Sequence, residues 1–465
     1  MLKSTTSKLF SKIISGKVSR KIAAKAFDLY IKKRLISDNK TDIPSVARYK
    51  YMISKALVSC VLRNIDKGII KLENTQRLME TLVDGGFNTI DHEAIARFKV
   101  KYGQKPPAFI TLSPFAGCNL KCKDCYAASE TCVKTQLDYK TVKKIVTEIH
   151  DVWGVRFVVI SGGEPFMYND NGKTIVDLFE DFPDIFFLIY TNATLITEDV
   201  AKRISKSGNV TPAISVEGYE KETDFRRGKG VYKILLSKFE LLKKHGVPFG
   251  VSVTATRNNA ELLTKDEFYD YYFQKVGVSY LWIFQYMPIG RGINPKMMIT
   301  PQQRLAMLRE WQHVLKDKEY FVADFWNSGV VSNGCIAYGK EGGYVYIDWN
   351  GNIMPCVFVP YYIDNIKDLY SKGKTLTDAI MSPMMKRGRK WQEQYKADKD
   401  NWLMPCSIRD HYQMFRKEIG MGAKPSDINA KEAQESKEYY DQMSKYDDEY
   451  DALTKKIWKE EFLEH

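Results

Sequence analysis

Between residues 105 and 300, short apolar runs alternate with longer segments in which apolar residues recur every three or four positions. The short runs predict buried strands, and the longer segments predict helices that each bury one face. Strands are expected at Ala108–Ser113, Arg156–Ser161, Ile185–Tyr190, Thr211–Val216, Phe249–Thr254 and Ser279–Gln285. Strands that alternate with helices form a parallel sheet with right-handed crossovers, so we predict an α/β fold.

The first 36 residues predict basic amphipathic helices with a break near Ser15–Gly16. Two apolar stripes run along them, formed by Leu9, Phe10, Ile13 and Ile14 and by Ile22, Ala23, Ala26, Phe27, Tyr30 and Ile31. Lysine and arginine side chains flank both stripes. Such a helix can lie in an anionic membrane interface, or it can pack on its own protein with a solvated basic face. Both interpretations fit this segment, and the first one favours a lipid substrate.

Two further regions are expected to be helical. Residues 45–100 predict a buried helix around Tyr49, Met52, Ala56 and Val58–Leu62, and another around Leu78, Met79 and Leu82 that ends at Gly85–Gly86. Cys60 lies in the first of these and is expected to be a core residue. After Arg416 the chain is highly charged, and one packing face recurs at Tyr439, Met443, Tyr446, Tyr450, Leu453 and Ile457.

Composition narrows the class of protein and its surroundings. The 465 residues are 44% hydrophobic and 27% charged, as in an ordinary soluble globular protein. There is no apolar run long enough for a membrane span and no apolar core of a secretory signal, so we expect a cytoplasmic protein. Eight cysteines are too few for a disulfide scaffold, which favours metal ligation in a reducing compartment. The net charge of +13 comes with no nucleic-acid-binding motif, so no nucleic-acid partner is expected.

The stretch Ser113–Tyr126 carries three closely spaced cysteines, Cys118, Cys122 and Cys125. Four cysteines normally hold the four irons of a [4Fe-4S] cluster. Three thiolates would therefore leave the fourth iron free to bind another molecule. Two alternatives stay open for this loop. It could hold structural zinc with Cys132 as a fourth ligand, or its cysteines could simply be buried.

The second motif, Gly162-Gly-Glu-Pro165, directly follows the second expected strand. Paired glycines let a backbone approach a ligand closely, and a carboxylate or carbonyl accepts hydrogen bonds from an ammonium group. In a parallel sheet, active residues gather at the carboxyl ends of the strands. The cysteine loop and this turn both lie at such an end, as do Ser215, near the end of the fourth strand, and Glu217, directly after it.

The spacing of Cys118, Cys122 and Cys125, followed by Gly162–Pro165, resembles the radical S-adenosylmethionine (radical SAM) superfamily. The resemblance implies a [4Fe-4S] cluster on the three cysteines, with its fourth iron chelated by the amino and carboxylate groups of SAM. An electron from the cluster then cleaves SAM to methionine and a 5′-deoxyadenosyl radical, which takes a hydrogen atom from the substrate. Asp124 departs from the family pattern, which usually has an aromatic residue before the third cysteine.

The same resemblance assigns residues to SAM. It places Gly162, Gly163, Glu164 and Pro165 at the amino group, and it places Ser215, Glu217 and Arg227 against the ribose or carboxylate, with Ser252 and Thr254 as weaker candidates. It also implies an open, partial (β/α)6 TIM-like barrel and a reductant such as ferredoxin or flavodoxin. It identifies no catalytic acid, base or radical-quenching residue.

A second cysteine set, Cys335, Cys356 and Cys406, follows the expected barrel. Cys356 comes just after an alternating run centred on Asn350–Gly351, which is a strong hairpin signal. This region resembles the SPASM or Twitch extension of radical SAM enzymes, which implies at most one auxiliary [4Fe-4S] cluster on these three cysteines. Its fourth iron would be open to substrate or capped by Cys132, Asp410 or His411. Alternatively, the three are core cysteines that remain after loss of a cluster.

We therefore expect a basic helical N-terminal extension (1–104), a radical SAM partial barrel (105–300), a small α+β iron–sulfur domain (301–415) and a helical tail (416–465). The expected function is a radical SAM enzyme, either an oxidoreductase or one that forms C–C or C–S bonds. Its substrate is a lipid or small molecule at a membrane surface, or a peptide, and it is cytoplasmic or peripheral at the inner face of the membrane. The alternatives are a membrane-associated iron–sulfur scaffold or electron carrier that does not cleave SAM, and a zinc-stabilised binding protein.

Overall fold

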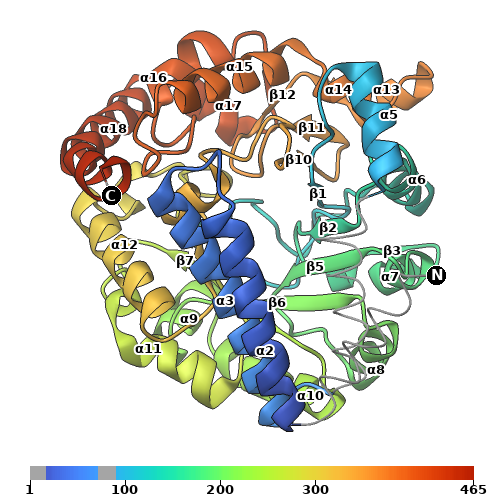
Figure 1. Cartoon of the computed structure of the whole chain (residues 1–465). Coiled ribbons are helices and arrows are strands. Elements are labelled where there is room, and N and C mark those ends of the chain that lie inside the picture. The colour runs from blue at the N-terminus through green and yellow to red at the C-terminus, as the bar shows by residue number, and fades with distance from the viewer. Residues whose placement is uncertain (1–16, 72–90, 465) are drawn as a thin grey trace.

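The computed structural model describes residues 17–71 and 91–464 and is built around one sheet in the order β13-β11-β10-β1-β2-β5-β6-β7-β8-β9. The strands expected from the sequence are β1 (Phe109–Leu112), β2 (Phe157–Ile160), β5 (Phe186–Thr191), β6 (Val210–Val216), β7 (Gly250–Ala255) and β8 (Leu281–Gln285). Neighbours within this set pair in parallel. In Figure 1 they curve into an incomplete ring with helices on the outside. The expected α/β partial barrel is confirmed.

The helices that follow the strands cover the outer face of the ring. They are α6 (Tyr139–Asp151), α7 (Ile175–Asp181), α8 (Glu198–Ser207), α9 (Glu220–Arg227), α10 (Val231–His245), α11 (Asp266–Asp270) and α12 (Pro301–Lys316). On α6, the apolar residues Val142, Ile145, Val146 and Ile149 are buried. Because helices cover the sheet from outside and side chains fill the ring from inside, the parallel strands are apolar on both faces.

The N-terminal helices α2 (Lys17–Lys32) and α3 (Pro44–Asp66) cross the open mouth of the ring (Figure 1). α3 lies at the amino ends of the strands, since Asn64 Nδ2 donates to the Gly277 carbonyl just before β8 and Cys60 Sγ accepts from the Phe321 N–H just before β9. The other end of α3 meets the last helical segment of the chain, where Ser45 Oγ donates to the Phe462 carbonyl. α3 therefore lies across the amino-terminal mouth, on the side opposite the sequence motifs.

The region after the barrel extends the same sheet. β9 (Val322–Asp324) pairs in parallel with β8 at one edge. At the other edge, the hairpin expected around Asn350–Gly351 forms as β10 (Tyr344–Ile347) and β11 (Asn352–Met354), and β13 (Asp364–Asn365) adds to it. β10 pairs with β1, with Phe109 opposite Tyr344. The hairpin thus belongs to the barrel sheet and does not form a separate one.

The remaining C-terminal elements form a helical layer beside the barrel. They are α13 (Ile366–Ser371), α14 (Leu376–Ile380), α15 (Pro383–Ala397), α16 (Tyr412–Met414), α17 (Ile428–Glu435) and α18 (Lys437–Ile457), and α5 (His92–Tyr102) precedes β1. Four members of the tail's expected packing face, Tyr439, Met443, Tyr446 and Tyr450, are buried on α18. The apolar stripe at Leu9–Ile14 and the helix expected around Leu78–Leu82 lie outside the described residues. No helix within residues 17–71 or 91–464 has the length and hydropathy needed to cross a membrane.

Candidate active site

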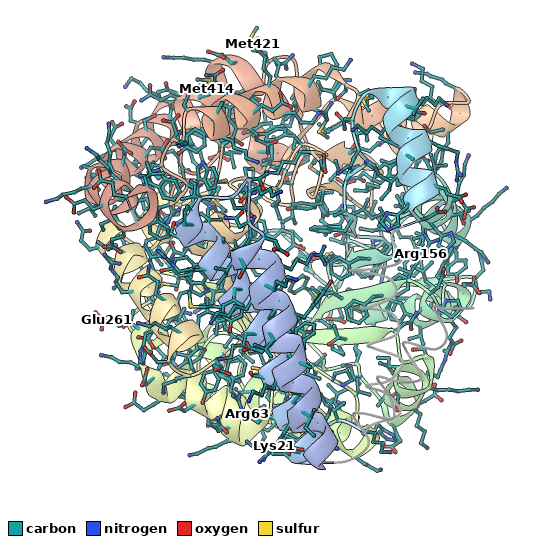
Figure 2. All side chains as sticks on the ribbon, viewed as in Figure 1. Lys21, Arg63, Arg156, Glu261, Met414 and Met421 are labelled. Atoms are coloured by element: carbon teal, nitrogen blue, oxygen red, sulfur yellow. The ribbon has the colours of Figure 1, made fainter. Side chains whose placement is uncertain are left out.

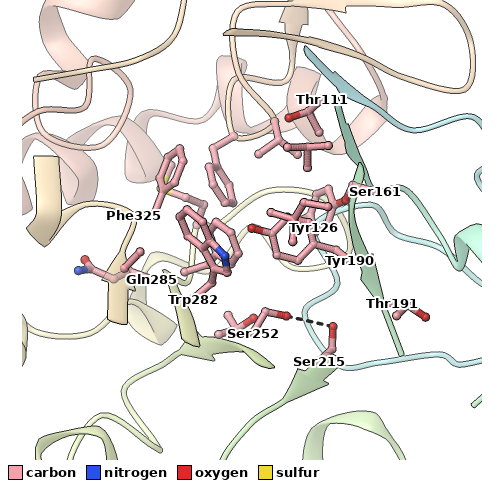
Figure 3. A pocket seen from close by; sticks show the side chains of 18 of the residues that line it. Thr111, Tyr126, Ser161, Tyr190, Thr191, Ser215, Ser252, Trp282, Gln285 and Phe325 are labelled. Carbon is pink, nitrogen blue, oxygen red and sulfur yellow. Dashed lines mark hydrogen bonds between the residues drawn. The ribbon is translucent and has the colours of Figure 1, made fainter. Parts of the chain in front are cut away.

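A cavity of about 390 Å³ runs through the inside of the barrel. At one end it is lined by Cys118, Cys122 and Cys125, which follow the carboxyl end of β1. At the other end it reaches Ile53 on α3, at the amino ends of the strands. Figure 3 shows aromatic side chains from the strands and the cysteine loop converging in its centre. Its volume is in the range of small-molecule binding sites.

The cysteine loop is held in place from two sides. The Lys123 N–H donates to the Arg226 carbonyl at 2.9 Å, and the Arg291 N–H donates to the Cys125 carbonyl at 2.9 Å. Gly290, in the segment after β8, has φ +68°, and a Cβ there would lie 2.1 Å from the Tyr126 carbonyl oxygen. Only glycine lets that segment pass so close to the loop. These contacts fix the position of the loop at the mouth of the cavity.

Burial dominates the electrostatics of Cys118. It raises the pKa of this thiol to about 12, because a thiolate loses its hydration in an apolar site. The Leu120 N–H and Asn192 Nδ2 lie 3.4 and 3.6 Å from Cys118 Sγ and can donate to it. Arg226 and Arg227 favour the thiolate of Cys122, although burial still raises its pKa. Within residues 17–71 and 91–464, no group of three or more Cys, His, Asp or Glu side chains is arranged to hold a single metal ion.

The Gly162–Pro165 turn packs directly against the cysteine loop. The Gly163 N–H donates to the Phe115 carbonyl at 3.0 Å and the Glu164 N–H donates to the Gly117 carbonyl at 2.8 Å. A Cβ on Gly163 would lie 2.0 Å from the Gly117 carbonyl oxygen, which no side chain could tolerate. Gly162 and Gly163 line the cavity, whereas Pro165 is buried at the start of a 3₁₀ turn. The two motifs recognised in the sequence are thus one structural unit.

The Glu164 side chain is fully buried and binds the next strand end instead of lining the cavity. Its carboxylate accepts hydrogen bonds from Thr191 Oγ1 at 2.6 Å, the Asn192 N–H at 2.8 Å and the Phe166 N–H at 3.2 Å. Burial raises its pKa to about 7, while these donors oppose the rise. Asn192 in turn contacts Cys118 Sγ. Glu164 therefore supports the cysteine loop through Asn192, and the two glycines of this turn line the cavity.

Glu217 is buried behind two arginines. Its Oε1 lies 2.6 Å from both Arg226 Nη1 and Arg227 Nη2. The arginines line the cavity and Glu217 does not, although all three residues lie at the carboxyl edge of the sheet. Ser215 lines the cavity beside Ser252, with the two hydroxyl oxygens 3.3 Å apart (Figure 3).

Arg226 was missed by the sequence prediction, which named only its neighbour Arg227. It also donates to Thr254 Oγ1 at 2.9 Å and to the Asp124 carbonyl at 3.1 Å, and so joins α9 to the cysteine loop. The sequence did contain an indication of Arg226, because this residue directly precedes Arg227 in the segment Asp224-Phe-Arg-Arg-Gly228. The Nε atoms of both arginines are buried and have no hydrogen-bond partner within the described part of the chain.

The second cysteine set comes together behind the cavity wall. Burial raises the pKa of Cys356 to about 12 and also raises that of Cys406, and negative charge on Cys335 would raise both further. Tyr344 links this set to the cavity, since it lines the cavity and its hydroxyl lies 2.9 Å from Cys356 Sγ. Both regions therefore share one tyrosine.

The candidate capping residues for an auxiliary cluster have other contacts. Both carboxylate oxygens of Asp410 bind the Arg304 guanidinium, at 2.5 and 3.2 Å. His411 Nε2 lies 2.9 Å from the Met404 carbonyl oxygen. Cys132 is exposed. In this arrangement both carboxylate oxygens of Asp410 are already hydrogen-bonded to Arg304.

The cavity's polar groups fit an iron–sulfur cluster together with an amino-acid-like cofactor. Three thiols at one end can ligate iron. Next to them, the two arginines offer unpartnered donors for a carboxylate, and the glycine turn offers backbone acceptors for an ammonium group. Ser215 and Ser252 add hydroxyls that can bind a ribose. These donors and acceptors match the groups of SAM.

Open barrels whose cavity ends at the carboxyl ends of parallel strands are typical of enzymes that hold a small cofactor there. Residues 112–261 match the model of the Radical SAM superfamily, so this part of the chain is a radical SAM domain. A [4Fe-4S] cluster and S-adenosylmethionine are accordingly the cofactors of this domain.

Individual relatives are distant. The AdoMet-dependent heme synthase of Methanosarcina barkeri (strain Fusaro / DSM 804) is 24% identical over 294 residues, which cover 56% of this chain and 80% of that protein. Streptococcus suis SuiB, solved bound to S-adenosylmethionine, has a TM-score of 0.50 and 18% identity, over 64% of this chain and 72% of SuiB. The structure of anSMEcpe with AdoMet and a Cp18Cys peptide has a TM-score of 0.50 and 18% identity, over 76% and 99% of the two chains. At these identities the structural likeness concerns the fold.

Proposed function

We propose that this protein uses Cys118, Cys122 and Cys125 to hold the [4Fe-4S] cluster at which SAM is cleaved, and that it abstracts hydrogen from a substrate in the barrel. When bound, the cluster and SAM supply a 5′-deoxyadenosyl radical. One observation carries the proposal: the three cysteines line the same cavity as the glycine turn and the two arginines. The reaction class, oxidoreductase or bond-forming, stays open within this proposal.

The chain's own residues would bind SAM from three directions. Backbone carbonyls of Gly162 and Gly163 accept from its ammonium group, while Arg226 and Arg227 donate to its carboxylate. Ser215 binds the ribose, and Glu217 orients both arginines from behind. Glu164 holds Asn192 against Cys118 without touching SAM. The apolar cavity walls keep water away from the reaction.

Cys335, Cys356 and Cys406 are proposed to hold an auxiliary cluster of the SPASM or Twitch kind. Their proximity supports this role, as does the position of Tyr344 between Cys356 and the cavity. With Asp410 bound to Arg304, the fourth iron would be left to another group or to substrate. Loss of the cluster, with the thiols retained as core, is the alternative.

The test is SAM cleavage by the full chain. The protein is purified without oxygen, reconstituted with iron and sulfide, reduced by dithionite or by a flavodoxin or ferredoxin system, and assayed for 5′-deoxyadenosine. About eight irons per chain are expected for two [4Fe-4S] clusters and about four for one. Bound iron without any 5′-deoxyadenosine, even with lipid and peptide extracts added, would support the scaffold or electron-carrier alternative.

Replacing Glu217 with glutamine is expected to weaken SAM binding about tenfold or more, because the buried carboxylate that orients Arg226 and Arg227 loses its charge. Isothermal titration calorimetry with SAM on the reconstituted protein measures the effect. Glu220→Gln, at an exposed position on α9, is the matched control and should bind SAM like the wild type. If the wild type, Glu217→Gln and Glu220→Gln bound SAM with equal affinity, Glu217 would have no role in SAM binding.

The membrane interpretation is retained as a proposal because of the outer face of α2. One face of this helix packs on α3, with Ile31 buried and Asp28 accepting from Tyr51 Oη at 2.6 Å. The other exposes Ile22 and Leu29, at 65% and 60%. Exposed basic residues flank them, and Figure 2 shows Lys21 at the outer end of the helix; the others include Lys25, Lys32 and Lys33. Apolar side chains among lysines suit an anionic bilayer surface.

We expect the wild type to float with vesicles that contain phosphatidylglycerol at low salt, and the double variant Ile22→Glu/Leu29→Glu to remain in the soluble fraction. Glutamates remove the apolar contact and oppose the anionic surface. Added salt should weaken flotation of the wild type, because lysine–phosphate attraction is screened. The control is Val100→Glu, at a residue of α5 that is 89% exposed. Flotation of the double variant to the wild-type extent would contradict the membrane proposal.

A further inference from the structure

Charge is distributed unevenly along the barrel cavity. The charged side chains that line it, Asp124, Arg226 and Arg227, all lie at the cysteine end. The rest of the wall is mainly aromatic and aliphatic, and includes Phe109, Phe157, Trp282, Phe284, Phe325 and Phe358. Its polar groups are neutral, from residues such as Thr111, Gln285, Ser328 and Ser332, and apolar area dominates its surface. The end assigned to SAM therefore carries the charged side chains, and the end left for a substrate is mainly apolar.

The aromatic wall is continuous. Phe284 contacts Tyr190 edge-on with ring centroids 5.4 Å apart, and it lies 5.6 Å from Phe325 and 5.8 Å from Phe358. At the amino ends of the strands, Phe109 stacks on Tyr344 at 4.9 Å. Figure 3 shows Tyr190, Trp282 and Phe325 directed into the same space. These rings come from β1, β5, β8, β10 and the C-terminal loops, so most of the barrel contributes to one apolar surface.

The inner end of this surface reaches the N-terminal helices. Phe109 and Phe157 are the first residues of β1 and β2, and Ile53 of α3 lines the cavity with them. Ile53 is only partly buried, and it marks the point where the apolar wall meets α3 at the amino-terminal mouth. Next to α3 lies α2, whose outer face carries the exposed Ile22 and Leu29 among lysines. The mouth and the basic apolar face are thus formed by adjacent helices.

A polar substrate segment would be costly in this space. A peptide group or a charge moved into an apolar wall loses its hydrogen bonds to water and finds few partners there. A hydrocarbon chain loses only unfavourable contact with water and gains contact with the rings. A chain that enters from the amino-terminal mouth can keep a charged head group outside, near the basic face of α2.

We propose that the inner part of the cavity binds the hydrocarbon chain of a lipid, which enters beneath α3 and points toward the cysteine end. The proposal rests on the proposed function, because it treats the inner part as the substrate site. Its occupant is argued from the apolar wall and from the charge complementarity between an anionic lipid surface and α2. A peptide substrate is the outcome that would overturn it.

The test measures binding of the neutral apolar fluorophore N-phenyl-1-naphthylamine to the reconstituted full-length protein, with saturating SAM. Geranylgeraniol and oleyl alcohol are the lipid competitors, and a short water-soluble peptide is the polar one. The variants are Ile53→Glu and Phe325→Glu, with Ile234→Glu on α10 as a matched control that is 42% exposed. Circular dichroism and thermal unfolding verify that each variant is folded.

Binding of the fluorophore with SAM present, and its displacement by the alcohols but not by the peptide, is the expected result. Ile53→Glu and Phe325→Glu should each weaken binding about tenfold or more, because each places a charge in the apolar wall. Ile234→Glu should bind as the wild type does. If Phe325→Glu does not fold, the binding measured for Ile53→Glu tests the inference, because Ile53 is partly exposed and its replacement is better tolerated.

Four results would overturn the inference. They are no binding by the wild type, displacement by the peptide but not by the alcohols, displacement by SAM alone, which places the fluorophore at the cysteine end, and wild-type binding by Ile53→Glu. These readouts need no reductant and no turnover. A lipid chain that binds to a protein unable to cleave SAM would therefore separate failure of the proposed function from failure of this inference.

Discussion

Replacing Cys118, Cys122 and Cys125 together with alanine is expected to abolish 5′-deoxyadenosine formation, to below a thousandth of the wild-type rate, an order-of-magnitude expectation for a lost cofactor. Each of the three thiols lines the cysteine end of the cavity, and other residues hold the loop in place. The variant should therefore fold and lose about four irons per chain. Iron content, visible absorption and the 5′-deoxyadenosine assay measure the result.

The matched control for this prediction is Cys60→Ala. Cys60 is a buried core thiol on α3, as expected from the sequence, and burial raises its pKa to about 11. Cys60 is not among the residues that line the cavity, so its loss should leave iron content and SAM cleavage unchanged. If the triple variant formed 5′-deoxyadenosine at the wild-type rate, the assignment of the cluster would be wrong.

The second large effect concerns stability. Asp410→Asn is expected to lower the free energy of unfolding by about 3–5 kcal/mol, the usual cost of leaving one partner of a buried ion pair uncompensated. Arg304 on α12 and Asp410 are both fully buried and form a two-point ion pair. Asp410 also accepts from the Cys406 N–H at 3.0 Å, so the pair anchors the segment that carries the third auxiliary cysteine.

Urea unfolding followed by circular dichroism measures this effect. Asp448→Asn is the control, since Asp448 is exposed on α18 and its loss should change stability by less than about 0.5 kcal/mol. The double variant Arg304→Met/Asp410→Leu should recover part of the loss, because it removes both buried charges at once. Equal unfolding midpoints for Asp410→Asn and the wild type would show that the pair does not stabilise the fold.

Local pattern was enough to predict the barrel strands. Their apolar runs are short and alternate with helices such as α10 (Val231–His245). The pairing of Tyr344 with Phe109 was not predictable in this way. A hairpin signal shows that two neighbouring segments pair, but the edge on which the hairpin docks depends on contacts with residues far away in the sequence.

In the candidate site, too, the sequence predicted some features, whereas others depend on contacts between distant residues. Motif spacing predicted which loops meet, because the carboxyl ends of parallel strands share one edge. The direction of the Glu164 side chain was not predictable, since it follows from donors on the next strand, at Thr191 and Asn192. The pairing of Glu217 with Arg226 as well as Arg227 also depends on the rotation of α9 against the cysteine loop, which spacing alone does not give.

The position of α3 has a consequence for the order of folding. This helix covers the amino-terminal mouth of the barrel, yet Tyr49 on it stacks between Trp311 and Phe462, which lie far away in the sequence. The barrel strands pair with segments nearer to them in the sequence, so they can form before α3 completes its packing. The folding protein therefore has a stage at which its barrel is formed and its floor is still loose.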